Sequence, residues 1–227
     1  MQYARLHPWE LTIPEARELQ ERLAAEVIEQ DRIVPLVRYV CGVDLSGSLA
    51  DGEVLGAAVV LSYPALELVE VRTARHRPLF PYIPGYLSFR ETPVLLNALE
   101  QLRTEPHLIF VDGHGRAHPR RFGIACHLGL ILNRPTLGCA KSVLVGEQRN
   151  PRLARGATAA LRDKGEQIGT AVRTRAGRRP VYVSAGHLVS LRAAVKWTLA
   201  CAPRFRLPEP ARLAHKAASG RLEPGLR

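Results

Sequence analysis

Two aspartates occupy the same kind of position in the sequence, at the end of a short apolar run. Asp44 follows Val43 near the end of one strand-like segment, and Asp112 follows Val111 at the end of another. Carboxylates at the ends of neighbouring strands meet at one edge of a sheet, and they repel each other unless one is protonated or a cation lies between them. The pair therefore favours a site for Mg²⁺ or Mn²⁺, which prefer hard oxygen ligands. The alternative is that each aspartate caps the turn after its strand.

Glu91 fits two different roles. The sequence Ser88-Phe89-Arg90-Glu91 has the form of a capping box, with Ser88 as the N-cap of a helix and Glu91 at its third position. In the other role, Glu91 is a third carboxylate that projects from the start of the helix toward the cation. A carboxylate tied to a backbone N–H has less freedom to bind a metal, so the two roles compete.

Four further groups could assist phosphate chemistry. His114 and His118 lie in the polar segment after Asp112, where they could bind phosphate or orient a carboxylate; no cysteine accompanies them, so zinc is not expected. Lys141 follows a short apolar strand, from which it could hold a scissile phosphate or an attacking water. His187 follows another strand, directly before a helix, and is a candidate at a third strand end. The alternatives are a surface cation for Lys141 and a turn residue for His187.

A rigid loop precedes the helix that carries Glu91. Residues 77–87 contain three prolines and a glycine, and Tyr82 lies between Pro81 and Pro84. An aromatic ring held between prolines can wedge into a stack of bases. The alternative is a loop folded onto the core, a role that Tyr86 fits.

The elements expected around these residues begin with a helix capped by Thr12 that runs to about residue 30, because apolar residues recur there at helical spacing. Three antiparallel strands should follow, and then helices and strands in alternation. The strands are expected at 37–46, 53–63, 66–76, 107–111, 136–140, 167–175 and 180–184, the later helices at 88–102, 122–132 and 188–201, a turn at 47–52, and loops at 113–121 and 149–165.

This order predicts an α/β fold with a mixed sheet, three antiparallel strands and then parallel strands, flanked by helices. A ribonuclease H-like fold has this order, although several mixed folds share it. The length of 227 residues suits one domain, 1–227. Its tail from about residue 203 is rich in proline and arginine, and we expect it either to wrap the domain or to be mobile.

The charge of the chain is unevenly distributed. Residues 1–112 carry 10 Lys and Arg against 16 Asp and Glu, whereas residues 113–227 carry 22 against 5. The second half therefore has a net charge of +17, which suits a polyanion held through its phosphates; the alternative is a bias of composition or solubility. No apolar run approaches a membrane span, and the four cysteines form no C-x-x-C pair. We expect no signal peptide, because charged residues interrupt the apolar residues near the start of the sequence. We expect a cytoplasmic protein with reduced thiols and no membrane contact.

Taken together, the motifs resemble those of the endonuclease V family over nearly the whole chain. The proline-tyrosine loop with the following Phe-Arg-Glu, and the run from Val111 to His118-Pro119-Arg120-Arg121, are the most specific. The matching segments are 42–46, 81–91, 111–115, 118–121, 138–142, 163–167, 184–187 and 207–212.

The resemblance implies a DNA-repair nuclease that depends on Mg²⁺ or Mn²⁺ and recognises deoxyinosine. It implies hydrolysis of the second phosphodiester bond on the 3′ side, leaving 3′-hydroxyl and 5′-phosphate ends; some family members also act on inosine in RNA. By matching motif, the metal ligands are Asp44, Glu91 and Asp112, and the supporting catalytic residues are Lys141, His118 and His187. The implied substrate-binding residues are the wedge Tyr82 together with Pro81, Ile83, Pro84, Gly85, Leu87, Arg90, Gly113, His118, Ile124 and Leu144.

Three alternatives remain at this point. The first is an inosine-specific ribonuclease. The second is a related nuclease that recognises branched or mismatched DNA by its shape and has no base pocket. The third is a nucleic-acid-binding protein without catalysis, which needs no carboxylate cluster. Protein partners and oligomeric state have no signature in the sequence.

Overall fold

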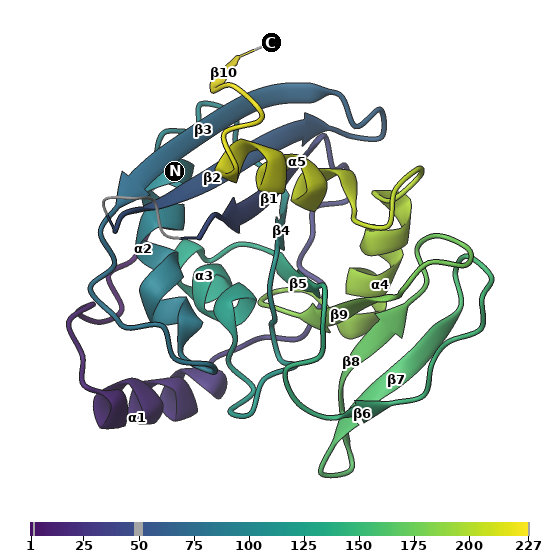
Figure 1. Ribbon diagram of the computed structural model, residues 1–227, viewed down its shortest axis with the longest axis horizontal. Helices are drawn as coiled ribbons and strands as arrows, with labels where there is room; N and C mark the ends of the chain where they lie inside the picture. Colours follow the sequence, from purple (N-terminus) through teal and green to yellow (C-terminus); the bar gives the residue numbers. More distant parts are fainter. Residues whose placement is uncertain (2, 48–51, 227) are drawn as a thin grey trace.

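The computed structural model describes residues 1, 3–47 and 52–226, and the strands of these residues form one mixed sheet (Figure 1). Its order is β10-β3-β2-β1-β4-β5-β9-β8-β7-β6. The strands are β1 Tyr39–Leu45, β2 Val54–Ser62, β3 Leu68–His76, β4 Leu108–Val111, β5 Thr136–Ala140, β6 Glu147–Gln148, β7 Thr158–Asp163, β8 Glu166–Val172, β9 Val181–Ala185 and β10 Gly225–Leu226.

The direction of the strands decides which residues share an edge of the sheet. β1, β2 and β3 form the expected antiparallel meander, and β4 and β5 run parallel to β1. β9 pairs antiparallel to β5, β8 pairs antiparallel to β9, and β7 pairs antiparallel to β8. The mixed sheet is therefore as predicted: the expected parallel direction holds for β4, β5 and β8, whereas β9 and β7 run antiparallel to β1. The carboxyl ends of β1, β4 and β5 lie at one edge, and the carboxyl end of β9 lies at the other.

Helices cover both faces of the sheet (Figure 1). Helices α2 and α3 pack on one face, and α4 and α5 pack on the other. In β1, Cys41 and Val43 face α2 and α3, whereas Val40 faces α4 and α5, because successive side chains of a strand point to opposite faces. The helices are α1 Ile13–Ala24, α2 Leu87–Glu100, α3 Ile124–Leu132, α4 Leu191–Ala200 and α5 Glu209–Ala218.

Helix α5 approaches the sheet closely because a glycine lies beneath it. A Cβ atom on Gly42 of β1 would come within 2.0 Å of the carbonyl oxygen of Pro210. Pro210 and Ala211 lie in the first turn of the helix, and both are buried. The lack of a side chain at Gly42 therefore allows α5 to rest directly on β1, and this contact positions every side chain that α5 directs toward the edge of the sheet.

Several elements differ from those expected. Thr12 does cap α1, in a capping box with Glu15, but the helix ends at Ala24. The expected loop at 149–165 contains β7, and the tail beyond Pro203 contains α5. Most of the expected turn at 47–52 lies outside the described residues. Within the part of the chain that the structure describes, no helix is long and apolar enough to cross a membrane.

Candidate active site

Asp44 and Asp112 lie side by side at one edge of the sheet. Val43 of β1 pairs with Val111 of β4 in parallel register, and the N–H of Asp112 donates to the carbonyl of Val43 at 3.1 Å. Oδ1 of Asp44 accepts the backbone N–H of Leu45 at 2.7 Å. The structure thus brings together the two aspartates that the sequence placed at neighbouring strand ends.

Lys141 joins this pair from the end of the next strand. It follows β5, which runs parallel to β4, and its Nζ forms an ion pair with Oδ2 of Asp112. The side chain of Asp112 is largely buried, whereas that of Lys141 is 40% exposed. The lysine can therefore face an incoming ligand while it holds one of the two carboxylates.

Helix α5 contributes a residue that the sequence interpretation missed. Nδ1 of His215 lies 2.8 Å from Oδ2 of Asp44, and ligand atoms of Asp44, Asp112 and His215 all lie within 4.8 Å of one another. A signal for this helix was present in the tail. Ala211, Ala214 and Ala218 recur at helical spacing and are buried. This spacing predicts a helix that contains His215, but it does not predict the contact with Asp44.

Glu91 faces the cluster because the expected capping box does not form. Helix α2 begins at Leu87, its N-cap is Tyr86, and no side chain caps it. The hydroxyl of Ser88 is buried and has no hydrogen-bond partner among the described residues. Glu91 is thus free of the backbone, and it lines the same pocket as Asp112. Glu91 is not one of the three residues whose ligand atoms all lie within 4.8 Å of one another.

The electrostatics of the cluster favour a cation. Burial and then the neighbouring Asp112 raise the pKa of Asp44 to about 6. Burial and then Asp44 and Asp112 raise the pKa of Glu91 to about 7. Three carboxylates and an imidazole around one partly buried space form a set of oxygen and nitrogen donors whose mutual repulsion a divalent ion would relieve. The residues therefore fit a Mg²⁺ or Mn²⁺ ion.

A pocket of about 460 Å³ adjoins the carboxylates. Eight of the predicted substrate-binding residues line it: Tyr82, Pro84, Gly85, Leu87, Gly113, His118, Ile124 and Leu144. Ser88, Glu91, Asp112, His114, Gly123, Ala140, Lys141, Ser142 and Val143 complete the lining. The volume is in the range of sites that hold small molecules.

Three predicted substrate-binding residues are absent from this lining. Pro81 is exposed outside it. Ile83 packs against the apolar cluster of α1 with Phe80 and Phe89, and the guanidinium of Arg90 donates to the carbonyl of Phe80 at 3.1 Å. Ile83 and Arg90 therefore hold the proline-rich loop from behind, because its inner side rests on α1 and α2.

The carbonyl of Gly85 holds the proline-rich loop in place. It accepts hydrogen bonds from Gln20 Nε2 at 3.1 Å, from His118 Nε2 at 3.0 Å and from Arg120 at 2.6 Å. Gln20, on α1, is fully buried and also accepts a hydrogen bond from Arg120 at 2.6 Å. One carbonyl thus joins the loop of Tyr82, helix α1 and the segment after β4, and no sequence motif marked Gln20.

Both ring nitrogens of His118 take part in these hydrogen bonds. Its Nε2–H donates to Gly85, and its Nδ1 accepts the backbone N–H of Arg120 at 3.2 Å. Burial, and then the neighbouring Arg120, lower the pKa of His118 to about 4. With both ring nitrogens engaged and the ring neutral, His118 shapes the pocket wall. Its predicted catalytic role stays a prediction.

His187 lies at the opposite edge of the sheet from the carboxylates. Its backbone N–H donates to the hydroxyl of Thr136, at the start of β5, at 2.9 Å, and its ring accepts the N–H of Ile28 at 3.2 Å. Leu137 pairs with Ala185 in antiparallel register, which sends the residues after β9 away from Lys141. The placement of His187 in the active site is therefore corrected: it is a buried turn residue.

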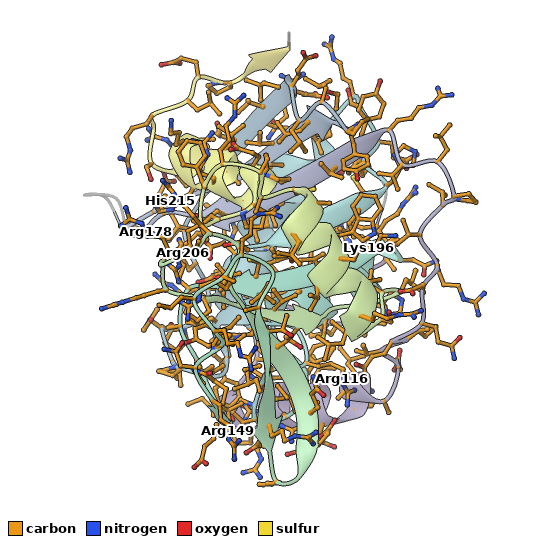
Figure 2. The ribbon with its side chains drawn as sticks, turned by 90° about the vertical axis from the view of Figure 1, so that its right-hand side faces the viewer. Arg116, Arg149, Arg178, Lys196, Arg206 and His215 are labelled. Atoms are coloured by element: carbon orange, nitrogen blue, oxygen red, sulfur yellow. The ribbon has the colours of Figure 1, made fainter. Side chains whose placement is uncertain are left out.

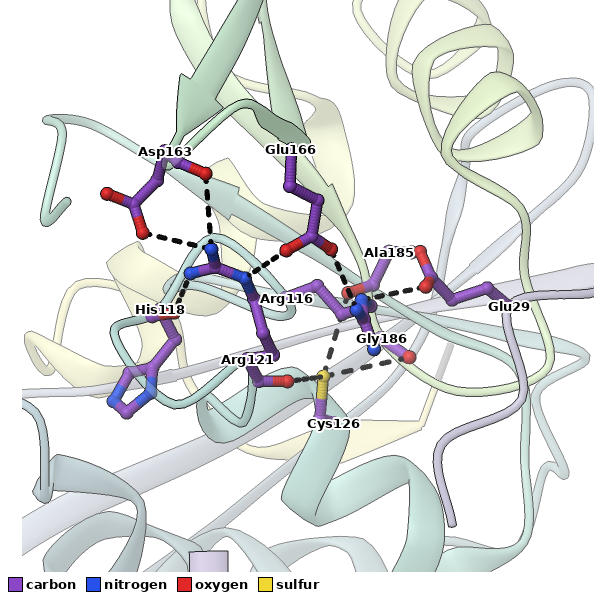
Figure 3. Close-up of polar contacts among 9 residues, drawn as sticks. All are labelled: Glu29, Arg116, His118, Arg121, Cys126, Asp163, Glu166, Ala185 and Gly186. Carbon is purple, nitrogen blue, oxygen red and sulfur yellow. Dashed lines mark hydrogen bonds and ion pairs between the residues drawn. The ribbon is translucent and has the colours of Figure 1, made fainter. Parts of the chain in front are cut away.

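Ion pairs fix the segment that carries His114 and His118 (Figure 3). Arg121 pairs with Asp163 at 2.9 Å and with Glu166 at 2.6 Å, and Arg116 pairs with Glu29 at 2.7 Å and with Glu166 at 3.0 Å. Asp163 and Glu166 flank the turn between β7 and β8. The hairpin therefore holds the wall of the pocket from outside.

A ribonuclease H-like sheet with carboxylates at the ends of its central strands, and a pocket beside them, defines a class of nucleases. The chain matches the family model described as Endonuclease V over residues 21–216. It is 51% identical over 222 residues to an endonuclease V from Trichormus variabilis, covering 97% of this chain and all of the relative. The chain belongs to the endonuclease V family.

Two solved structures agree with this assignment. A crystal structure of the endonuclease V from Streptomyces avermitilis superposes with a TM-score of 0.89 and is 41% identical, covering 93% of each chain. The endonuclease V of Ciona intestinalis, in complex with a 24mer DNA containing an inosine followed by a ribo-adenosine, gives a TM-score of 0.80 at 30% identity. This match covers 92% of this chain and 96% of the other.

Proposed function

We propose that the protein is a divalent-metal-dependent endonuclease that recognises deoxyinosine in DNA and acts in DNA repair. In this proposal it hydrolyses the second phosphodiester bond on the 3′ side of the lesion, leaving 3′-hydroxyl and 5′-phosphate ends. The observation that carries the proposal is the position of the cluster of Asp44, Asp112 and His215, directly beside a pocket that Asp112 also lines. The inosine-containing DNA in the Ciona complex supports the choice of base.

The proposed metal ligands are Asp44, Asp112 and His215, with Glu91 as a further carboxylate on the pocket side. A bound Mg²⁺ or Mn²⁺ would lower the pKa of a water and stabilise the charge that develops on the phosphate. Lys141 supplies a fixed positive charge beside Asp112, where it can hold a phosphate oxygen. The water oxygen bonds to phosphorus and the P–O3′ bond breaks, so the phosphate stays on the 5′ end.

The pocket and the loop of Tyr82 have complementary proposed roles. A base judged by its edge must leave the stack and enter a pocket. Tyr82 lines the pocket mouth and is 68% exposed, so its ring is available to fill the gap that the base leaves. A cut beyond the base requires the metal site to be offset from the pocket along the nucleic-acid strand. Asp44 and His215 lie outside the pocket lining, whereas Asp112, which pairs with Lys141, lies within it.

Cleavage of matched oligonucleotides tests this function. DNA duplexes that differ only in one inosine or adenine, and the corresponding RNA strands, are incubated with Mg²⁺, with chelator, and with the Asp112→Asn variant, and the product ends are mapped. We expect cutting at the second bond 3′ of inosine, abolished by chelator and by Asp112→Asn, while binding persists. Equal cutting of both duplexes would favour a shape-directed nuclease, and cutting of RNA alone would favour an inosine-specific ribonuclease.

A further inference from the structure

The edge of the sheet that carries the carboxylates continues into loops rich in arginine. Because β9 and β7 are antiparallel to their neighbours β5 and β8, β8 ends at this edge and β9 and β7 begin there. The loops at 149–157 and 173–180 therefore emerge at the same edge as Lys141. The register pairs that show this are Ala140 with Tyr182, Val172 with Val181, and Thr158 with Val172.

Arg173 binds two of these loops together from inside. It is 3% exposed, and its guanidinium donates to the side chain of Asn150 at 3.0 Å and to the carbonyls of Pro151, Arg152 and Arg178. All four of these acceptors are neutral oxygens of the loops. The loops are therefore held in a defined shape around one buried cation.

Arg206 connects the same loops to the candidate active site. It donates to the carbonyls of Arg179 at 2.9 Å, Pro180 at 2.8 Å and Lys141 at 3.0 Å. Lys141 is the residue whose Nζ pairs with Asp112. Arg206 thus makes one continuous surface of the segment at 203–206, the loop at 173–180 and the edge of the sheet that carries the carboxylates.

Arginine side chains on the outside of these loops are left without internal partners. In residues 1, 3–47 and 52–226, no hydrogen bond or ion pair of the structure involves their guanidinium groups. No Asp or Glu occurs between residues 168 and 208, or between 148 and 162, so no acid in these segments neutralises them. We call this set of exposed side chains the arginine edge: Arg149, Arg152, Arg175, Arg178, Arg179 and Arg204.

We propose that the arginine edge is a second nucleic-acid contact surface, which binds the phosphate backbone of the substrate beyond the cut bond. The inference rests on the proposed function and names where the flanking nucleic acid lies. Figure 2 shows this side of the molecule: Arg178 and Arg206 lie toward the same margin as His215, and Arg149 lies lower, toward the hairpin of β7 and β8. A nucleic-acid strand that leaves the carboxylate cluster past Lys141 meets these arginines next, because Arg206 joins Lys141 to the loop at 173–180.

The arginines named here in the second half of the chain are of two kinds: those with partners inside the protein, and those of the arginine edge, which have none among the described residues. Arg116 and Arg121 are neutralised by carboxylates, and Arg173 and Arg206 are occupied by carbonyls. Phosphate-binding groups fix the register of a nucleic acid but carry no sequence information. The arginine edge should therefore add affinity for long substrates without changing the preference for a base.

The test uses the variant Arg175→Gln/Arg178→Gln/Arg179→Gln. Its matched control is Arg32→Gln/Arg38→Gln/Arg103→Gln, which removes three exposed arginines away from the arginine edge, near the starts of β1 and β4 and the end of β9. Cleavage and binding are measured on an inosine duplex with short flanks and on the same centre with long flanks, over a range of salt. Thermal melting checks that each variant is folded, and Arg149→Gln/Arg152→Gln is a second variant of the same surface.

We expect the edge variant to lose the advantage of long flanks while it cuts the short substrate as the wild type does. Its slope of log affinity against log salt should fall by about 2–3, at roughly 0.9 for each phosphate that the variant no longer binds. An unchanged slope and flank advantage in both edge variants, or an equal effect in the control, would overturn the inference. Binding of inosine-free duplex tests the surface separately, so a failure of inosine specificity alone would count only against the proposed function.

Discussion

Nδ1 of His215 lies 2.8 Å from Oδ2 of Asp44, although 171 residues separate them in the chain. The hydrogen bond joins the first strand of the sheet to the last helix. Because Asp44 also lies against Asp112 and Lys141, this one interaction makes the position of α5 part of the geometry of the candidate metal site. That relationship, and the pocket beside it, lead to four testable consequences.

Replacement of His215 tests whether α5 contributes a functional group. His215→Ala removes the imidazole beside Asp44, and we expect both the rate of cleavage and the affinity for Mn²⁺ to fall by about 10- to 100-fold, with little change in melting temperature. The matched control is Lys216→Ala, the exposed neighbour on the same helix. A variant that cleaves and binds Mn²⁺ like the wild type would remove His215 from the site.

Gly42→Ala tests whether the close approach of α5 matters. The new Cβ would meet the carbonyl oxygen of Pro210 at 2.0 Å, so the helix must move away from β1. We expect a loss of stability of about 1–3 kcal/mol, typical of overpacking, together with a loss of cleavage as His215 shifts. Gly47→Ala, where no atom of the described residues lies within 4 Å of the new atom, should change neither. Unfolding in denaturant and cleavage rates measure both effects, and equal behaviour of the two variants would contradict this account.

The carboxylate cluster should make the metal-free protein sensitive to pH. The pKa values of Asp44, about 6, and Glu91, about 7, are raised above their ordinary values. The folded state therefore holds protons that the unfolded state has released, and this contribution to stability is present below about pH 4 and is lost as pH rises through 6 to 7. A bound cation replaces those protons, so the gain in melting temperature on adding Mg²⁺ should grow over the same interval.

Melting curves from about pH 4 to about pH 8, with Mg²⁺ and with chelator, measure this dependence. Glu91→Gln is the matched variant, because it keeps the shape of the side chain and removes one of the two titrating carboxylates. It should flatten the pH dependence of the metal-free protein. A gain from Mg²⁺ that is the same at every pH would show that the cation does not compete with these protons.

Tyr82→Ala separates recognition of the base from the chemistry of cleavage. The ring is 68% exposed, so its removal should leave the melting temperature unchanged, unlike the destabilisation expected of a core residue. Stacking on a base is worth on the order of 1–3 kcal/mol, so cleavage of inosine in duplex DNA should weaken. The effect should be smaller on single-stranded DNA, where less stacking is broken. Equal effects on both substrates would contradict the wedge.

The strand-end residues could be predicted from the sequence alone. Asp44, Asp112 and Lys141 each follow a short apolar run, and the local pattern is enough to recognise such runs as strands. The pocket residues follow from motifs of the family, and eight of them line one cavity. The capping box of Thr12 and Glu15 could also be predicted in part, from Thr12 as the N-cap, since the interacting groups are close in sequence.

Three features were decided only by the tertiary structure. The periodicity of a strand does not encode its direction, because parallel and antiparallel strands have the same alternation of side chains. From the sequence, His187 is therefore a candidate site residue at a third strand end, yet β9 runs antiparallel to β5 and carries it to the other edge. In the same way, the form of a capping box at Ser88 did not reveal that α2 begins at Leu87 and leaves Glu91 free.

The last of these features is the site of His215. The sequence by itself determined the order of the elements, the carboxylates at strand ends and the family motifs, because these depend on local patterns along the chain. The docking of α5 on β1 depends on the absence of a side chain at Gly42 beneath Pro210, a fit between segments far apart in the sequence. Only the folded chain brings these surfaces together, and so only the tertiary structure decided that His215 completes the cluster with Asp44 and Asp112.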